Sequence, residues 1–224
     1  MTSGLIPNSF LASSQSPRSS VLPRLLAAAL LAIGATAPAL ALAGELVPLA
    51  DKAVVLAFGD SLTSGIGGSG ENYPQRLVTL IGHDVINAGV PGETTAQGRE
   101  RLAAVLRDSR PGLLILCLGV NDFLRGVPVA QIGANLGAML DLAAEASVPV
   151  LLLAVPAPGA SQIDPLFAGM ARPGQVRVDL HAMADTLMQP ALKAGLVHPN
   201  AEGYRQIAKA VAQTLRDSGA LVSR

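Results

Sequence analysis

Apolar and polar positions follow two patterns that alternate along the chain. Short runs that are apolar throughout, such as "LLILCLG" at residues 113–119, are typical of strands buried on both faces of a parallel sheet. Between these runs lie longer stretches whose apolar residues recur every three or four positions, which is the helical period. Strand and helix in alternation predict βαβ units and a parallel sheet.

The two patterns assign most of the chain to elements. Expected strands are residues 52–58, 84–87, 113–119, 148–155 and 176–180. Expected helices are residues 73–82, 94–112, 129–147 and 200–219. Gly82 and Pro111 are stop signals, and Asn200 is a helix cap. Residues 156–175 are rich in proline and glycine, so we expect a loop there with one helical turn around residues 165–170.

These segments predict an α/β fold, a three-layer α/β/α sandwich of about five parallel strands in one domain of residues 44–224. Half of the residues are apolar, which is enough for one sizeable core. Ligands of such sheets bind beyond the carboxyl ends of the strands. The loops that follow the strands are therefore where we expect the chemistry.

Residues 1–43 differ in composition from the rest of the chain. They contain no acid and two arginines, and their apolar stretch of residues 25–43 ends in the small-x-small pattern Ala41-Leu42-Ala43. This pattern predicts a cleaved secretory signal peptide and a periplasmic or secreted protein with no stable membrane anchor after cleavage. The alternative is an uncleaved anchor helix, because the apolar stretch is about long enough to span a bilayer.

Charge and cysteine content narrow the possible partners. Lys and Arg together number 16, as do Asp and Glu, and no charge run is present, so we expect no nucleic-acid partner. We expect a small-molecule substrate. Cys117 is the only cysteine and lies in an apolar run, which favours a packed core thiol over a disulfide or a metal site. Neither a metal nor an organic cofactor is expected.

Four loops carry the residues that could do chemistry. "GDSLTSGIGG" presents Ser61 at the end of the first strand, and "NAGVPGETT" offers glycine amides after the second. "GVND" supplies the Asn121 amide, and "VHPNAEGY" presents His198 from a turn stiffened by a proline. Taken singly, each also has a structural interpretation: a capping serine, a tight connection, an Asx turn or a structural histidine.

Taken together, the four loops closely resemble the SGNH hydrolase superfamily, also called the GDSL esterase/lipase family, over essentially the whole mature chain. The resemblance is closest to its secreted arylesterases, thioesterases and lysophospholipases. It implies a flavodoxin-like fold, with Ser61 as nucleophile and His198 as general base. It also implies an oxyanion hole made of the Ser61 amide, the Gly92 amide and the Asn121 side chain. Gly92 is chosen over Gly89 because Glu93 and Thr94 follow it.

The sequence departs from the family at one position. The family's histidine usually has an aspartate three positions before it, where this chain has Gly195. One resolution is a Ser-His dyad in which a backbone carbonyl, that of Gly195, accepts the Nδ1 hydrogen. A second is an acid from elsewhere, and a third is a chain that binds an acyl ligand without efficient catalysis. The acids considered for the second are Asp179, Asp185 and Glu202.

The expected function is an exported serine esterase that hydrolyses carboxylic esters or thioesters through an acyl-serine intermediate. Leu62, Thr63 and residues 123–126 are expected to line or support an acyl pocket. With four Phe, two Tyr and no Trp in the chain, the walls of that pocket should be aliphatic. This argues against a carbohydrate O-acetyl esterase, which is the alternative enzyme.

Overall fold

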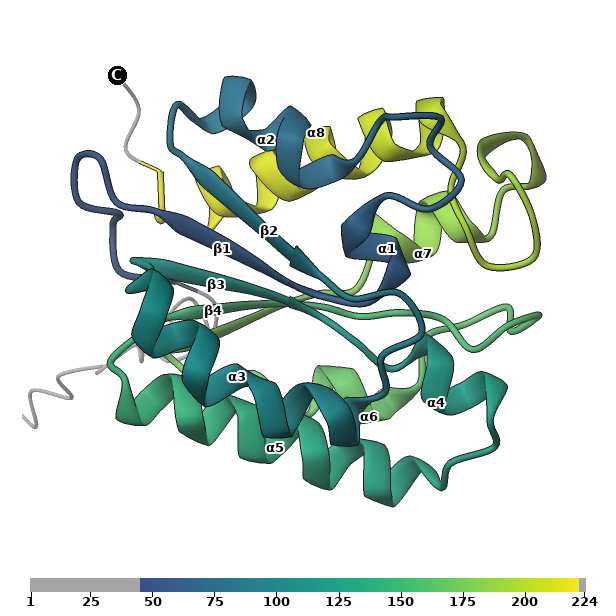
Figure 1. Cartoon of the computed structure of the whole chain (residues 1–224), viewed down its shortest axis with the longest axis horizontal. Helices are drawn as coiled ribbons and strands as arrows, with labels where there is room; N and C mark the ends of the chain where they lie inside the picture. Colours follow the sequence, from purple (N-terminus) through teal and green to yellow (C-terminus); the bar gives the residue numbers. More distant parts are fainter. Residues whose placement is uncertain (1–44, 222–224) are drawn as a thin grey trace, which may run out of the picture. The chain divides into compact units, whose positions relative to one another are not determined.

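Five parallel strands form the centre of the molecule (Figure 1). The computed structural model describes residues 45–221, and the predicted signal peptide therefore lies outside the described residues. The sheet has the strand order β2-β1-β3-β4-β5. The strands are β1 (Val55–Gly59), β2 (Val85–Gly89), β3 (Leu113–Cys117), β4 (Val150–Leu153) and β5 (Val176–Asp179).

Helices cover both faces of the sheet, which completes the three predicted layers (Figure 1). The longer helices are α2 (Tyr73–Ile81), α3 (Thr95–Ser109), α5 (Val129–Glu145) and α8 (Ala201–Asp217). The shorter ones are α1 (Ser61–Ser64), α4 (Val120–Leu124), α6 (Pro165–Ala168), α7 (Ala182–Leu187) and the 3₁₀ helix η1 (Pro190–Leu192). Helices α2 and α8 pack side by side on one face, and α3 and α5 on the other.

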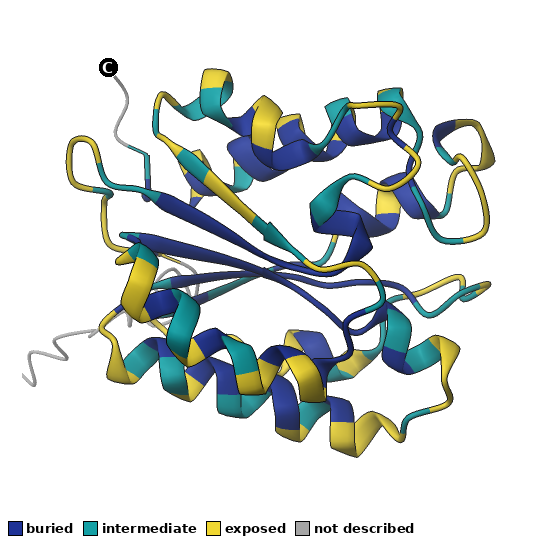
Figure 2. Ribbon diagram, viewed as in Figure 1, coloured by how far each residue is buried: buried dark blue, intermediate teal, exposed yellow. Residues whose placement is uncertain are grey.

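The core lies between these layers (Figure 2). Every residue of β1, β3 and β4 is buried, as expected for strands covered on both faces, whereas the edge strand β2 is partly exposed. Helix α8 turns one apolar face toward the sheet and keeps its charged residues outside. The uniform apolar runs of the sequence thus mark the three inner strands.

Capping residues begin and end the longer helices, and they include the predicted Asn200 and Gly82. Asn72 and Asn200 accept backbone hydrogen bonds at the first turns of α2 and α8. Thr94 and Gln97 form a reciprocal capping box at the start of α3. Gly82 ends α2 in the left-handed conformation that glycine adopts without strain.

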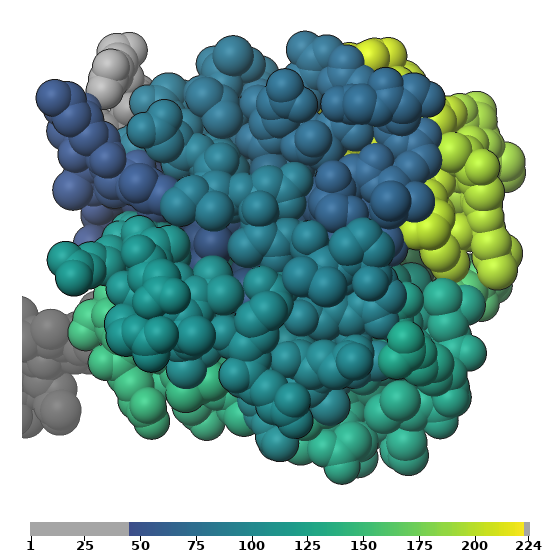
Figure 3. All heavy atoms as spheres, in the orientation of Figure 1, coloured from purple at the N-terminus to yellow at the C-terminus, as the bar shows by residue number. Residues whose placement is uncertain are grey.

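The strand order brings the key loops together. The chain runs from β1 to β2 on one side of it and later places β3 on the other side. The connections that leave the carboxyl ends of β1 and β3 therefore run in opposite directions, which makes a topological switch point between these two strands. In Figure 3 segments coloured blue, teal and yellow, which are distant in sequence, adjoin along the right-hand edge that these ends face. Within residues 45–221 no helix combines the length and apolar content needed to cross a membrane.

Candidate functional site

Ser61 stands at a sharp turn between β1 and α1. The chain leaves β1 at Gly59, where a side chain would collide with the Cys117 carbonyl and the Thr63 hydroxyl. Asp60 caps α1, its Oδ1 accepting a hydrogen bond of 2.9 Å from the Leu62 amide. Ser61 is the first residue of α1, a position whose N–H has no acceptor inside the helix. The turn therefore leaves a hydroxyl and a backbone donor at the end of the central strand.

His198 reaches Ser61 from the loop before α8. Its Nε2 lies 2.9 Å from Ser61 Oγ, across 137 positions of sequence. Burial lowers the pKa of the imidazole, because the charged form loses hydration. Ser61 and His198, which the sequence analysis paired, are thus joined by a hydrogen bond between their side chains.

The loop that carries Gly67 packs closely against the backbone of His198 and Pro199. A Cβ at Gly67, whose φ is +90°, would come within 2.7 Å of the Pro199 carbonyl oxygen and 3.0 Å of His198 Cβ. The Tyr204 hydroxyl donates to the carbonyl of Ile66, at 2.9 Å, and so fixes this loop to α8. The backbone on both sides of the imidazole is thus held by packing and hydrogen bonds.

Asn121 joins the loops that follow β1, β2 and β3. It lies in the first turn of the short helix α4, and its Nδ2 donates to Asp60 Oδ2 at 3.2 Å and to the Glu93 carbonyl at 2.9 Å. Because an amide nitrogen carries two hydrogens, both donors are used in this arrangement. The side chain is held beside the turn that presents Ser61.

Gly92 lies in the loop that Asn121 contacts. Its φ of +81° is in the left-handed region, and its amide donates to no other residue within the described part of the chain. Its carbonyl accepts a hydrogen bond of 2.9 Å from Arg125 Nη2. The loops carrying all four predicted residues therefore meet at one edge of the sheet, with the Ser61 and Gly92 amides open to a ligand.

Three buried carboxyl groups surround this arrangement, and two of them are well compensated. Glu93 forms a bidentate ion pair with Arg101, at 2.8 and 2.7 Å, and the Arg101 guanidinium also lies 3.9 Å from the centre of the Phe58 ring. Asp122 accepts from the amide and hydroxyl of Thr95, at 2.9 and 2.6 Å. The sequence alone does not identify Arg101 and Thr95 as the partners of these acids.

Asp60 is the third buried acid, and among residues 45–221 its carboxylate accepts only from neutral amides, those of Leu62 and Asn121. Burial raises its pKa to about 7, assisted by the negative charges of Glu93 and Asp122, although the hydrogen bond from Leu62 acts in the opposite direction. A carboxyl group that titrates near neutral pH thus lies directly behind Ser61 and Asn121.

No carboxylate considered in place of Gly195 meets the imidazole. Asp179 accepts from the amides of His181 and Ala182 and from Thr214 Oγ1, so it caps α7. Asp185 lies 3.7 Å from His181, and Glu202 pairs with Arg205 on the surface of α8. The expected hydrogen bond to the Gly195 carbonyl is also absent, because within residues 45–221 the imidazole is bonded only to Ser61.

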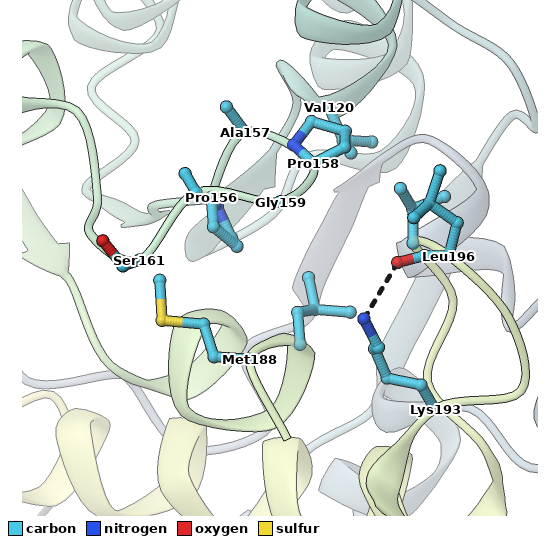
Figure 4. A pocket seen from close by; sticks show the side chains of 12 residues that line it. Val120, Pro156, Ala157, Pro158, Gly159, Ser161, Met188, Lys193 and Leu196 are labelled. Atoms are coloured by element: carbon cyan, nitrogen blue, oxygen red, sulfur yellow. Dashed lines mark hydrogen bonds between the residues drawn. The ribbon is translucent and has the colours of Figure 1, made fainter. Parts of the chain in front are cut away.

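Figure 4 shows a pocket of about 430 Å³, whose lining includes Val120 and Val197, the chain neighbours of Asn121 and His198. Leu62, Thr63 and residues 123–126, expected to line or support an acyl pocket, do not line this one, and the first two are buried in the turn. Its walls come from the end of α7, the loop before His198 and the proline-rich loop after β4. The lining residues are Val120, Pro156, Ala157, Pro158, Gly159, Ala160, Ser161, Leu187, Met188, Lys193, Leu196 and Val197.

The raised pKa of Asp60 makes stability depend on pH. Between about pH 4 and pH 7 the folded protein keeps a proton on Asp60 that the unfolded chain releases, so the free energy of unfolding should fall as pH rises. The contribution of this group is on the order of 4 kcal/mol across that range. Urea unfolding over this pH series should therefore show the stability of the wild type falling more steeply with pH than that of Asp60→Asn, which has no carboxyl group to titrate at this position.

Asp108→Asn, which removes an exposed carboxylate of α3, is the charge-matched control and should keep the pH dependence of the wild type. Parallel curves for the wild type and Asp60→Asn would contradict the assignment.

Comparison with known proteins supports the resemblance. Residues 57–206 match the model of the GDSL-like Lipase/Acylhydrolase family. The arylesterase of Vibrio mimicus is 31% identical over 175 residues, 72% of this chain and 87% of that protein. Esterase TesA of Pseudomonas aeruginosa is 36% identical over 113 residues, 46% of this chain, so the match spans only 55% of that relative.

A solved structure agrees with these relatives. The SGNH-hydrolase family esterase AlinE4 superposes with a TM-score of 0.59 at 33% identity, over 75% of this chain and 97% of that one. The fold, the four loops and a family match over more than half of the residues lead to one conclusion: the chain belongs to the GDSL-like lipase/acylhydrolase family and is a hydrolase of ester bonds.

Proposed function

We propose that this chain hydrolyses carboxylic esters or thioesters through an acyl-serine intermediate formed on Ser61. The observation that carries this proposal is the 2.9 Å hydrogen bond between Ser61 Oγ and His198 Nε2. A serine hydroxyl is a weak nucleophile until a base within hydrogen-bond reach removes its proton. Ser61 and His198 are therefore the proposed catalytic residues.

His198 acts first as base and then as acid. To accept the Ser61 proton on Nε2, the neutral imidazole must carry its hydrogen on Nδ1. The lowered pKa of His198 keeps the ring neutral, and hence able to act as a base, at near-neutral pH. After Ser61 attacks the carbonyl, the protonated ring gives its proton to the leaving group, and it then activates the water that hydrolyses the acyl-serine.

The oxyanion formed by this attack needs hydrogen-bond donors. We assign this role to the amides of Ser61 and Gly92 and to the side chain of Asn121. Both backbone amides lack an acceptor in the described structure, which makes them available. For Asn121, the 3.2 Å bond to Asp60 is the longer of its two, and we propose that this hydrogen is the one shared with the oxyanion.

The catalytic pair is proposed to work as a Ser-His dyad. The three acids that could substitute for the usual aspartate are engaged elsewhere, and Gly195 offers no carboxylate. A ring held only by its backbone and by Ser61 keeps its position. It gains no stabilisation of the imidazolium that forms during the reaction.

The pocket beside the site favours an apolar group on the substrate. Its walls are aliphatic side chains, proline rings and backbone, with no aromatic side chain among the lining residues. An aromatic platform for a sugar ring is therefore absent from this pocket, which supports an acyl ester rather than an acetylated carbohydrate as the substrate.

The protein is also proposed to be exported, because residues 1–43 have the composition of a cleaved signal peptide. Expression of the full chain in a Gram-negative host, followed by an intact-mass measurement of the periplasmic fraction, should give a protein that begins at Gly44. A chain retained at full length in the membrane fraction would favour the anchor helix instead.

Replacing the nucleophile tests the enzyme against a binding protein with the same fold. Ser61→Ala should lower the turnover of p-nitrophenyl butyrate by at least about a thousandfold, because the acyl intermediate cannot form. Ser109→Ala, at the distant end of α3, serves as the matched serine control and should behave as the wild type. Equal, background-level rates for the wild type and Ser61→Ala would leave only the acyl-binding role.

Restoring an acid at Gly195 tests the dyad. A Cβ at this position meets no atom within 4 Å, so an aspartate can be introduced without a clash. A carboxylate near the imidazole would raise the pKa of His198. The acidic limb of the kcat/KM profile should then move to higher pH, while the plateau rate increases by about tenfold. Gly195→Asn has nearly the same size without the charge, and identical profiles for the two variants would exclude this account.

A further inference from the structure

One charged side chain lines the pocket beside the proposed catalytic pair. Of the twelve lining residues only Ser161 and Lys193 have polar side chains, and the others are apolar or glycine. Pockets that bind small molecules typically combine apolar walls with a few polar groups that fix orientation. The charge of Lys193 is therefore the feature of this pocket that can distinguish one ester from another.

Lys193 is positioned to use that charge. Its Nζ donates a hydrogen bond of 3.1 Å to the Leu196 carbonyl, and Figure 4 shows the side chain reaching toward Leu196 along the pocket wall. An ammonium group has three hydrogens, so two donors remain. Within residues 45–221 the ammonium forms no ion pair, and no lining residue carries a carboxylate.

Two of the residues that line the pocket are chain neighbours of proposed site residues. Val197 immediately precedes His198, and Val120 immediately precedes Asn121. These two residues place the pocket beside the proposed general base and a proposed oxyanion donor. We infer that a substrate whose carbonyl lies against these two groups extends one of its substituents into the pocket.

We propose that this substituent is an apolar chain carrying one anionic group, a carboxylate or a phosphate, and that Lys193 Nζ binds the anion. The inference rests on the proposed function and names the substrate class for the same site. The apolar walls take the chain, while the ammonium selects esters whose far end is negatively charged.

The expected size of the effect follows from the partial exposure of Lys193. A hydrogen bond to a charged group contributes more in a protected position than an ion pair between exposed side chains does. An intermediate contribution corresponds to a preference of roughly five- to tenfold in kcat/KM. Because salt screens partly exposed charges, the preference should weaken between about 20 mM and about 500 mM KCl.

Matched pairs of soluble esters test the inference. One pair places the carboxylate on the acyl side, mono-p-nitrophenyl adipate against p-nitrophenyl hexanoate. The other places it on the alcohol side, 4-acetoxybenzoate against its methyl ester. The quantity measured is the ratio of kcat/KM for the anionic ester to that for the neutral ester, in the wild type and in Lys193→Gln.

The wild-type ratio should exceed the Lys193→Gln ratio by five- to tenfold in one of the two pairs, and that pair shows which side of the ester enters the pocket. Lys193→Arg should restore most of the preference. Lys52→Gln, which removes a lysine before β1 at the opposite edge of the sheet, is the control and should keep the wild-type ratio.

Equal ratios for the wild type and Lys193→Gln in both pairs would overturn the inference, even if the neutral esters are hydrolysed. Absence of any hydrolysis that depends on Ser61 would instead overturn the proposed function. The two failures can therefore be told apart.

Discussion

The site depends on how tightly the chain can turn at the end of β1. Gly59 is paired with Gly89 on one side and with Cys117 on the other, and a side chain there would collide with its surroundings. The absence of a Cβ lets Asp60 enter the interior and lets Ser61 begin α1 at the switch point. Everything else in the site is arranged around this turn: the donors approach it from the loops after β2 and β3, and His198 from the opposite helical layer.

The same turn buries the Asp60 carboxyl group close to those of Glu93 and Asp122, so that negative charges on these groups repel one another. Glu93 has the Arg101 guanidinium, and Asp122 has the amide and hydroxyl donors of Thr95. Asp60 is buried without a cationic partner among residues 45–221, and burial, assisted by the charges of Glu93 and Asp122, raises its pKa to about 7. A negative charge at Asp60 would oppose the developing oxyanion. Its hydrogen bond with Asn121, however, keeps a proposed oxyanion donor in place. Asp60 thus orients this donor, although its own charge would be unfavourable next to the oxyanion.

Much of the fold was predictable from the sequence, because uniform apolar runs fix the inner strands and the caps at Thr94 and Asn200 fix helix ends. The helices α1 and α4 were not predicted, since elements of four or five residues have no period and depend on tertiary contacts such as the Asn121 hydrogen bonds. The lining of the pocket in Figure 4 was not predicted, because it combines two irregular loops whose path no local pattern specifies. The candidate residues were predicted through the resemblance, whereas the sequence does not show which side chains contact them.

The missing carboxylate at Gly195 affects one stage of the proposed reaction. The hydrogen bond from Ser61 to His198 is present with no carboxylate behind the ring, and the histidine backbone is fixed by the close approach of Gly67 and by the bond from Tyr204 to Ile66. An acid is therefore not needed to position the base in the ground state. It would act only once the imidazole becomes positively charged, which happens on the way to the tetrahedral intermediate. In the proposed mechanism a group that acts only there alters kcat and leaves substrate binding as it is, so we expect the missing acid at Gly195 to lower turnover rather than substrate affinity.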